Sequence, residues 1–106
     1  MSDTAATDAA RNRVLDTAKA LIGGDRAATY GDATKNFTRI GRLWAPILDL
    51  ENVTAEQVAL CMAALKICRL CTGPDHFDSW VDGAGYLALG AEIALGRDSG
   101  TADTEQ

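Results

Sequence analysis

Hydrophobic residues recur at helical spacing through the first half of the 106-residue chain. From about Asp8 to Ile22, one apolar face consists of Val14, Leu15, Ala18, Leu21 and Ile22. A second stripe follows an N-cap candidate at Asp32 and consists of Phe37, Ile40, Leu43, Trp44, Ile47 and Leu48. The spacing predicts two amphipathic helices, the first ended by Gly23-Gly24 and the second kinked or frayed near Pro46.

The third helical segment has the clearest boundaries. Thr54 and Gln57 have the spacing of a capping box, and Thr72-Gly73-Pro74 ends the segment with a glycine and a proline. The residues predicted to face inward are Val58, Cys61, Met62, Leu65, Cys68 and Leu70.

The fourth segment consists mostly of small residues. It begins at Asp75 or Asp78 and runs to about Leu95. Its interior glycines are Gly83, Gly85 and Gly90. Each of them costs about 1 kcal/mol relative to alanine in a helix. We therefore expect close packing against another helix, within the subunit or across a dimer, or else close approach of a ligand.

These segments predict an all-α, four-helix bundle-like single domain over residues 8–96. Residues 1–7 and 97–106 read as flexible, acidic tails that hold most of the net charge of −5. A domain this small is expected to gain stability as a homo-oligomer. No basic field suggests duplex nucleic acid, and no apolar run suggests a membrane partner. Three cysteines without an export signal predict free thiols and a cytoplasmic location.

Charges of opposite sign flank the Gly73-Pro74 break. Lys66 and Arg69 share one surface of the third helix, and Asp78 and Asp82 lie one turn apart on the fourth. Antiparallel packing would place the two pairs opposite each other at the turn end. They could form a salt-bridge network that clasps the hairpin. Alternatively, Lys66 and Arg69 could bind phosphate while the aspartates orient them.

Two metal sites are conceivable from residue types alone. Asp78 and Asp82, with Asp32 as a third ligand, could hold magnesium. Cys61, Cys68 and Cys71 with His76 could hold zinc. Against zinc, Cys61 and Cys68 lie on the predicted apolar face, where cysteine behaves as a small hydrophobe. His76 alone is more simply a hydrogen-bonding residue at the helix start.

The loop before the second helix carries Tyr30-Gly31-Asp32. The simplest interpretation is a turn followed by an N-cap. Alternatively, Tyr30 could stack on a nucleobase, with Arg26 adding a positive charge nearby.

The combined order YGD…KxxR…DxxxDxxGY resembles a family of small phage and prophage proteins over residues 26–90. It also resembles a phage domain associated with nucleotide modification and, at greater distance, is similar to all-α nucleotide pyrophosphohydrolases of the MazG type. The resemblance implies a helical phage protein in nucleotide-related biology within the host cell. MazG-type enzymes hold magnesium with an ExxE pair, whereas the matching helix here carries Lys66 and Arg69.

The leading hypothesis is therefore a protein that binds, and could sequester, a nucleotide or nucleotide-derived signal without turnover and without a cofactor. Lys66, Arg69 and Arg26 would meet phosphate, Tyr30 would stack, and Asp78, Asp82 and His76 would complete the site. One alternative is a magnesium-dependent, MazG-like pyrophosphohydrolase or a nucleotide-modification accessory protein. Another is a phage inhibitor that docks on a host protein.

Overall fold

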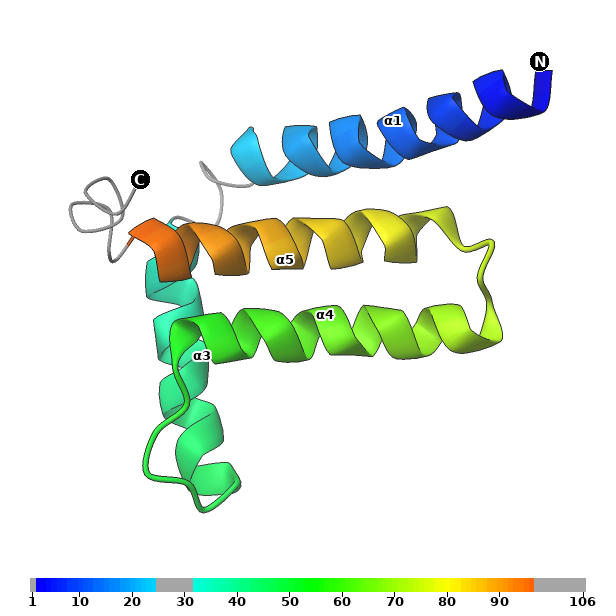
Figure 1. The fold of residues 1–106 in the computed structure, drawn as a ribbon. Helices are drawn as coiled ribbons and strands as arrows, with labels where there is room; N and C mark the ends of the chain where they lie inside the picture. The colour runs from blue at the N-terminus through cyan, green and yellow to red at the C-terminus, as the bar shows by residue number, and fades with distance from the viewer. Residues whose placement is uncertain (1, 25–31, 97–106) are drawn as a thin grey trace.

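The computed structural model describes residues 2–24 and 32–96, with side chains from residue 9 onward. This part contains four helices and no strand: α1 (Ser2–Gly23), α3 (Ala33–Ile47), α4 (Ala55–Thr72) and α5 (Phe77–Gly96) (Figure 1). The all-α prediction is confirmed. Helix α1 begins at Ser2 rather than at the expected Asp8, so residues 2–7 are helical. Residues 97–106 lie outside the described residues.

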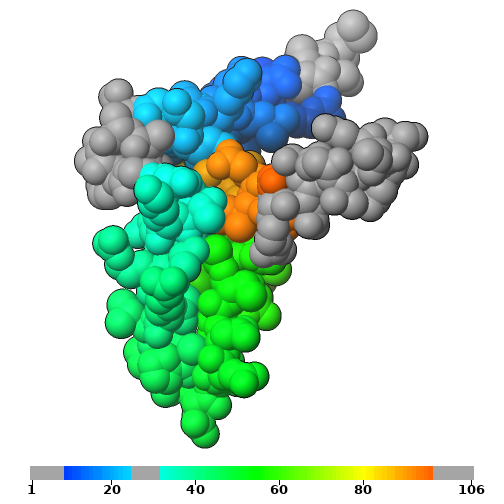
Figure 2. Space-filling model, turned by 90° about the vertical axis from the view of Figure 1, so that its left-hand side faces the viewer, coloured from blue at the N-terminus to red at the C-terminus, as the bar shows by residue number. Residues whose placement is uncertain are grey.

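Helices α4 and α5 form an antiparallel hairpin, and the other two helices pack around it. Helix α1 lies along the side of α5 that faces away from α4, and α3 runs across one face of the hairpin (Figures 1 and 2). The pairs with extensive contact are α4 with α5, α1 with α5, and α3 with α4. The opposite face of the hairpin carries no described helix (Figure 2).

The local start signals in the sequence are confirmed. The Thr34 N–H donates to Asp32 Oδ1 at 2.9 Å, which caps α3. The Gln57 N–H donates to Thr54 Oγ1 at 3.2 Å, and the Thr54 N–H donates to Gln57 Oε1 at 2.8 Å, which completes the capping box of α4. Helix α3 ends just after Pro46, where the Leu48 N–H donates to the carbonyls of Pro46 and Trp44.

The core is built largely from small side chains, because the helices approach closely. A Cβ added at Gly90 would lie 3.0 Å from Ala59 Cβ on α4, and one at Gly85 would lie 3.3 Å from Ile22 Cγ2 on α1. The central buried cluster consists of Phe37, Ala55, Val58, Ala59, Leu89 and Ile93. Close packing within the subunit therefore accounts for two of the three interior glycines of α5.

Several hydrophobic residues predicted to be buried are exposed instead. On α4, Cys61, Leu65 and Cys68 are exposed, because the helix contacts its neighbours through its alanine-rich side. At the end of α3, Leu43, Ile47 and Leu48 are also exposed, because this end extends past α4 (Figure 1). None of the described helices is long and apolar enough to cross a bilayer.

Candidate functional site

One ion pair joins the two helices of the hairpin near its turn. Lys66 Nζ on α4 lies 3.0 Å from Asp82 Oδ2 on α5, and the two side chains are 30% and 37% exposed. The antiparallel hairpin creates this pairing, because Lys66 precedes the turn by about as many residues as Asp82 follows it. The prediction that bases and acids face each other is confirmed for this pair.

Arg69 does not join the aspartates but reaches the turn. Its Nη2 donates to His76 Nε2 at 3.4 Å, and His76 Nδ1 lies 2.7 Å from the hydroxyl of Ser79. Ser79 is almost completely buried. Asp78 is exposed and makes no ion pair within the described part of the chain. The predicted four-charge network is therefore wrong in part, since His76 takes the place that Asp78 was expected to occupy.

Two further contacts fix the start of α5. The Trp80 Nε1–H donates to the Pro74 carbonyl at 2.7 Å, which ties the first turn of α5 to the connection from α4. The Arg13 guanidinium lies 4.7 Å from the ring centroid of Phe77, a cation–π contact that ties α1 to the same end. Sequence reasoning missed Ser79 and Arg13. The spacing of Ser79 three residues after His76 was the only local signal, and Arg13 carried none.

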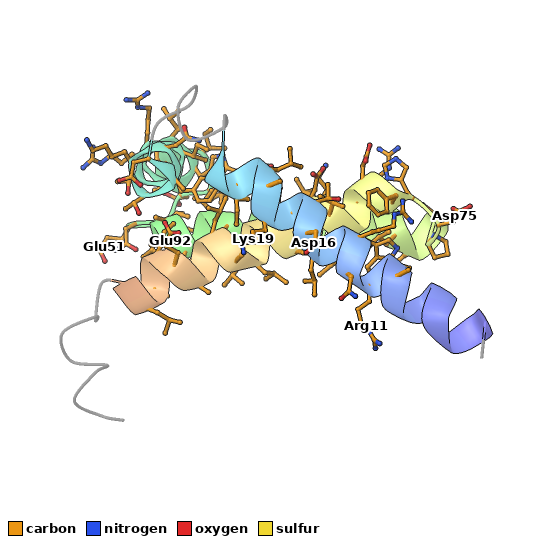
Figure 3. All side chains as sticks on the ribbon, turned by 90° about the horizontal axis from the view of Figure 1, so that it is seen from above. Arg11, Asp16, Lys19, Glu51, Asp75 and Glu92 are labelled. Atoms are coloured by element: carbon orange, nitrogen blue, oxygen red, sulfur yellow. The ribbon has the colours of Figure 1, made fainter. Side chains whose placement is uncertain are left out.

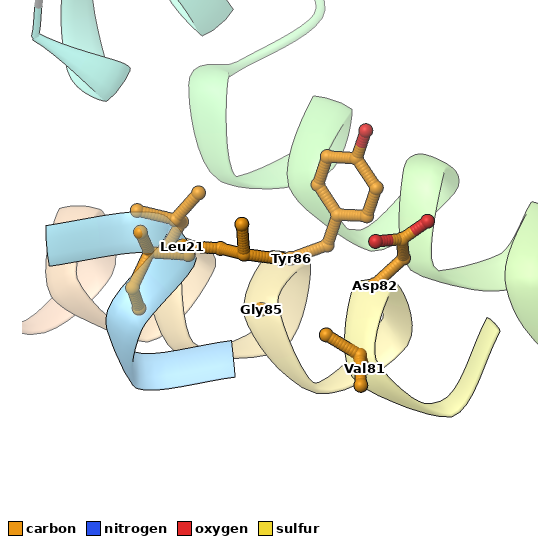
Figure 4. A pocket seen from close by; sticks show the side chains of 7 residues that line it. Leu21, Val81, Asp82, Gly85 and Tyr86 are labelled. Atoms are coloured by element: carbon orange, nitrogen blue, oxygen red, sulfur yellow. The ribbon is translucent and has the colours of Figure 1, made fainter. Parts of the chain in front are cut away.

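A small cleft of about 90 Å³ lies beside Asp82, between the last turn of α1 and α5. Leu21, Ile22, Val81, Asp82, Gly85, Tyr86 and Leu89 line it. The Asp82 carboxylate and the Tyr86 hydroxyl both extend toward α4 (Figure 4). The cleft is smaller than the roughly 300–1,000 Å³ of typical ligand pockets. A nucleotide-sized molecule would therefore lie mainly on the surface, with only a small group inside the cleft.

Neither of the conceivable metal sites forms. Within residues 9–24 and 32–96, no group of three or more His, Cys, Asp or Glu side chains could hold a metal ion. The zinc interpretation is wrong because Cys61, Cys68 and Cys71 are exposed along α4 while His76 contacts Arg69 and Ser79.

The predicted third magnesium ligand lies elsewhere. Asp32 caps α3 and lines a hollow together with Glu92, which lies ten residues beyond Asp82 on α5. That distance is about 15 Å along a helix. Figure 3 shows Glu92 toward the opposite end of the molecule from Asp75, which lies at the turn. Asp32 therefore cannot complete a site with Asp78 and Asp82. Arg26 and Tyr30 lie outside the described residues.

Comparison with known proteins identifies phage relatives. Residues 13–94 match the model of a domain of unknown function, DUF6378. The chain is 40% identical over 85 residues to the Gene 55 protein of Mycobacterium phage L5, covering 80% of this chain and 54% of that protein. It is 37% identical over 73 residues to the Gene 55 protein of Mycobacterium phage D29, covering 69% and 48%. The chain thus spans about half the length of these relatives. No solved structure matches.

Proposed function

The chain belongs to the DUF6378 family of phage proteins, and we propose that it binds the phosphate groups of a nucleotide or nucleotide-derived ligand at Lys66 and Arg69, without turnover. The observation that carries this proposal is the 3.0 Å pair between Lys66 and Asp82. The pair fixes an ammonium group beside Asp82, one of the residues that line the cleft, with a guanidinium one turn further along α4.

The two bases suit phosphate for complementary reasons. Lys66 presents a compact charge held in place by Asp82, and Arg69 presents a planar set of donors that contacts His76. Both remain accessible, since Lys66 is only half-buried and Arg69 is exposed. A phosphate that approaches Lys66 and Arg69 together would share the ammonium with Asp82. The cleft next to Asp82 could take a small part of the same ligand.

The same geometry favours binding over magnesium-dependent hydrolysis. Such hydrolysis brings carboxylates, magnesium and substrate phosphates together. Here Asp82 is engaged by Lys66, and Asp78 has no carboxylate partner on α4, because the facing residues are bases. A binder of this kind in a phage could withhold a nucleotide signal from its host.

Isothermal titration calorimetry against nucleotides, cyclic dinucleotides and ADP-ribose derivatives tests the proposal. We expect at least one of them to bind, and the Lys66→Ala variant to lose at least tenfold in affinity, because a charge-assisted contact to phosphate is removed. Lys35→Ala is the matched control, since Lys35 is an exposed lysine on α3 away from the hairpin turn. Binding that is absent for all three classes, or equal in wild type and Lys66→Ala, would contradict the proposal.

Asp82→Asn distinguishes the binder from the hydrolase. If Lys66 binds phosphate, removing the neighbouring carboxylate should raise affinity about three- to tenfold at low salt, and the gain should shrink as salt screens the charges. If Asp82 instead held magnesium, the same variant would abolish magnesium-dependent release of pyrophosphate from nucleoside triphosphates. If Asp82→Asn instead lowered the affinity for phosphate in magnesium-free buffer, both expectations for Asp82 would be contradicted.

A further inference from the structure

The α4/α5 hairpin carries two matching stripes of apolar and small residues. On α4 the stripe consists of Leu60, Ala64, Ile67 and Cys71, and on α5 of Trp80, Ala84, Leu87 and Ala91. Both follow the 4-3-4 spacing that repeats on one side of a helix in coiled-coil packing. The large members are about half exposed: Leu60 56%, Ile67 55%, Trp80 49% and Leu87 49%.

Both stripes face the same side of the hairpin. On α4, Val58 faces α3, as shown by its contact with the position of Gly41. On α5, Tyr86 faces α3, because its ring lies 6.3 Å from that of Phe37. At about 100° per residue, each stripe lies roughly 130–150° around its helix from these positions. The stripes therefore share the side opposite α3, which faces the viewer in Figure 1. We call this surface the open face.

Between the ends of the two stripes, the open face is free of charge. Between Leu60 and Cys71, the charged residues of α4 are Lys66 and Arg69, and these point to the ion pair with Asp82 and to His76. Between Trp80 and Ala91, the charged residue of α5 is Asp82. A surface that combines large exposed apolar side chains with no charge is typical of an interface rather than of a solvated helix face.

We propose that a second copy of this chain covers the open face, so that two hairpins pack face to face as a four-helix bundle. A two-fold interface requires a patch that is complementary to itself, and each stripe alternates large and small residues at heptad-like spacing, so large residues of one copy can meet small residues of the other. The small residues Ala64, Ala84 and Ala91 lie between the large ones, and so provide recesses into which the partner's Ile67 and Leu87 can pack.

The open face has the size of a small interface. Each stripe spans twelve residues, about 18 Å, and two helices packed side by side are about 20 Å wide. Such a face covers roughly 360 Å² before side-chain relief, less than the roughly 800 Å² that each partner buries in a standard interface, so we expect dimerisation at micromolar concentration. Trp80 is held in place by its hydrogen bond to the Pro74 carbonyl, and aromatic residues of this kind often dominate the binding energy of an interface.

Sedimentation velocity of the full chain tests this proposal. We expect wild type to have twice the 11.2 kDa mass of one chain at micromolar concentration. Ile67→Glu and Leu87→Glu should each weaken the dimer at least 100-fold and give monomers of unchanged helix content, because both residues are exposed in the single chain. Leu43→Glu is the control, since Leu43 is equally exposed but lies on α3, on the other side of the hairpin.

Three results would overturn the proposal. The first is a wild-type monomer up to about 100 μM, far above the micromolar concentration at which we expect the dimer. The second is a dimer that both glutamate variants leave intact. The third is a dimer that Leu43→Glu dissociates as strongly as Leu87→Glu. If a glutamate variant fails to fold, Leu87→Ala replaces it, because it adds no charge and should still weaken the dimer at least tenfold.

Discussion

Toward α4 and α1, helix α5 presents Ser79, Gly85 and Gly90, whereas toward its open face it presents Trp80 and Leu87. The buried side thus combines the smallest residues with Val81, Leu89 and Ile93, and the exposed side includes the largest residue, Trp80. The largest fully buried side chains in the described part of the chain are Val58 and Ser79. Where α4 and α5 meet at Ala59 and Gly90, close backbone approach replaces bulky side chains.

Small and large hydrophobic residues therefore have separate roles in this molecule. Glycine and alanine let α1, α4 and α5 approach each other, and they determine the fold. The large aliphatic and aromatic residues of the open face contribute little to the single chain. On the buried side, we expect a larger side chain to lower the stability at any protein concentration. On the open face, we expect a smaller side chain to weaken the dimer, so the effect depends on protein concentration.

Gly90→Leu should cause the largest loss of stability. The first added carbon would already lie 3.0 Å from Ala59 Cβ, and the remaining atoms have no space between α4 and α5. We expect a loss of about 3 kcal/mol or more, which corresponds to roughly 12–24 °C in the melting temperature of a domain this size. Thermal unfolding followed by circular dichroism measures it, and an unchanged melting temperature would show that the helices do not approach this closely.

Val58→Ala and Leu87→Ala form a direct contrast between the two sides. Val58 is completely buried, so its truncation should cost about 2–3 kcal/mol at any protein concentration. Leu87 is the larger residue but is half exposed, so its truncation should cost less than about 1 kcal/mol in dilute monomer. Urea unfolding at nanomolar concentration measures both values, and equal losses would remove the distinction between the sides.

Gly83→Ala should stabilise the protein. A Cβ there would lie 3.7 Å from Lys66 Cβ, an ordinary van der Waals distance. The helix should therefore gain the usual advantage of alanine over glycine, about 0.5–1 kcal/mol. Urea unfolding of the two single variants Gly83→Ala and Gly90→Ala compares their free energies of unfolding. A loss of stability at position 83 would mean that α4 and α5 pack more tightly than described.

Lys66→Ala should have the smallest effect on stability. The ion pair with Asp82 is about one-third exposed, and pairs of this kind contribute about 0–1 kcal/mol. The same variant should lose most of its affinity for phosphate, so stability and binding separate at this residue. A stability loss well above 1 kcal/mol in urea would instead identify the pair as a structural clasp.

The sequence predicted the helices well because their signals are local. The capping box of Thr54 and Gln57 and the cap at Asp32 depend only on neighbouring residues. The burial of Cys61 and Cys68 was predicted wrongly, because α4 is apolar around most of its surface. Periodicity cannot tell which apolar side meets a neighbour in the same chain.

For the candidate site, the short turn was enough to predict that bases of α4 would face aspartates of α5, as Lys66 and Asp82 do. The contact of Arg13 with Phe77 could not be predicted, because it depends on how α1 packs against α5. The prediction of Asp32 as a third magnesium ligand was wrong for a related reason. Its distance from Asp82 depends on the direction in which α3 crosses the hairpin, which no local pattern encodes.

If two copies pack as proposed, the open face is covered in the dimer, whereas other exposed positions on the same hairpin are not. The most direct test compares two single-thiol proteins, one that retains only Cys68 and one in which Ala91→Cys is the only thiol. Both positions are exposed in the single chain, but only Ala91 belongs to the open face. At micromolar concentration we expect the thiol introduced at position 91 to react with a maleimide at least tenfold more slowly than Cys68, and the rates to converge on dilution. Equal rates at every concentration would contradict the proposed dimer.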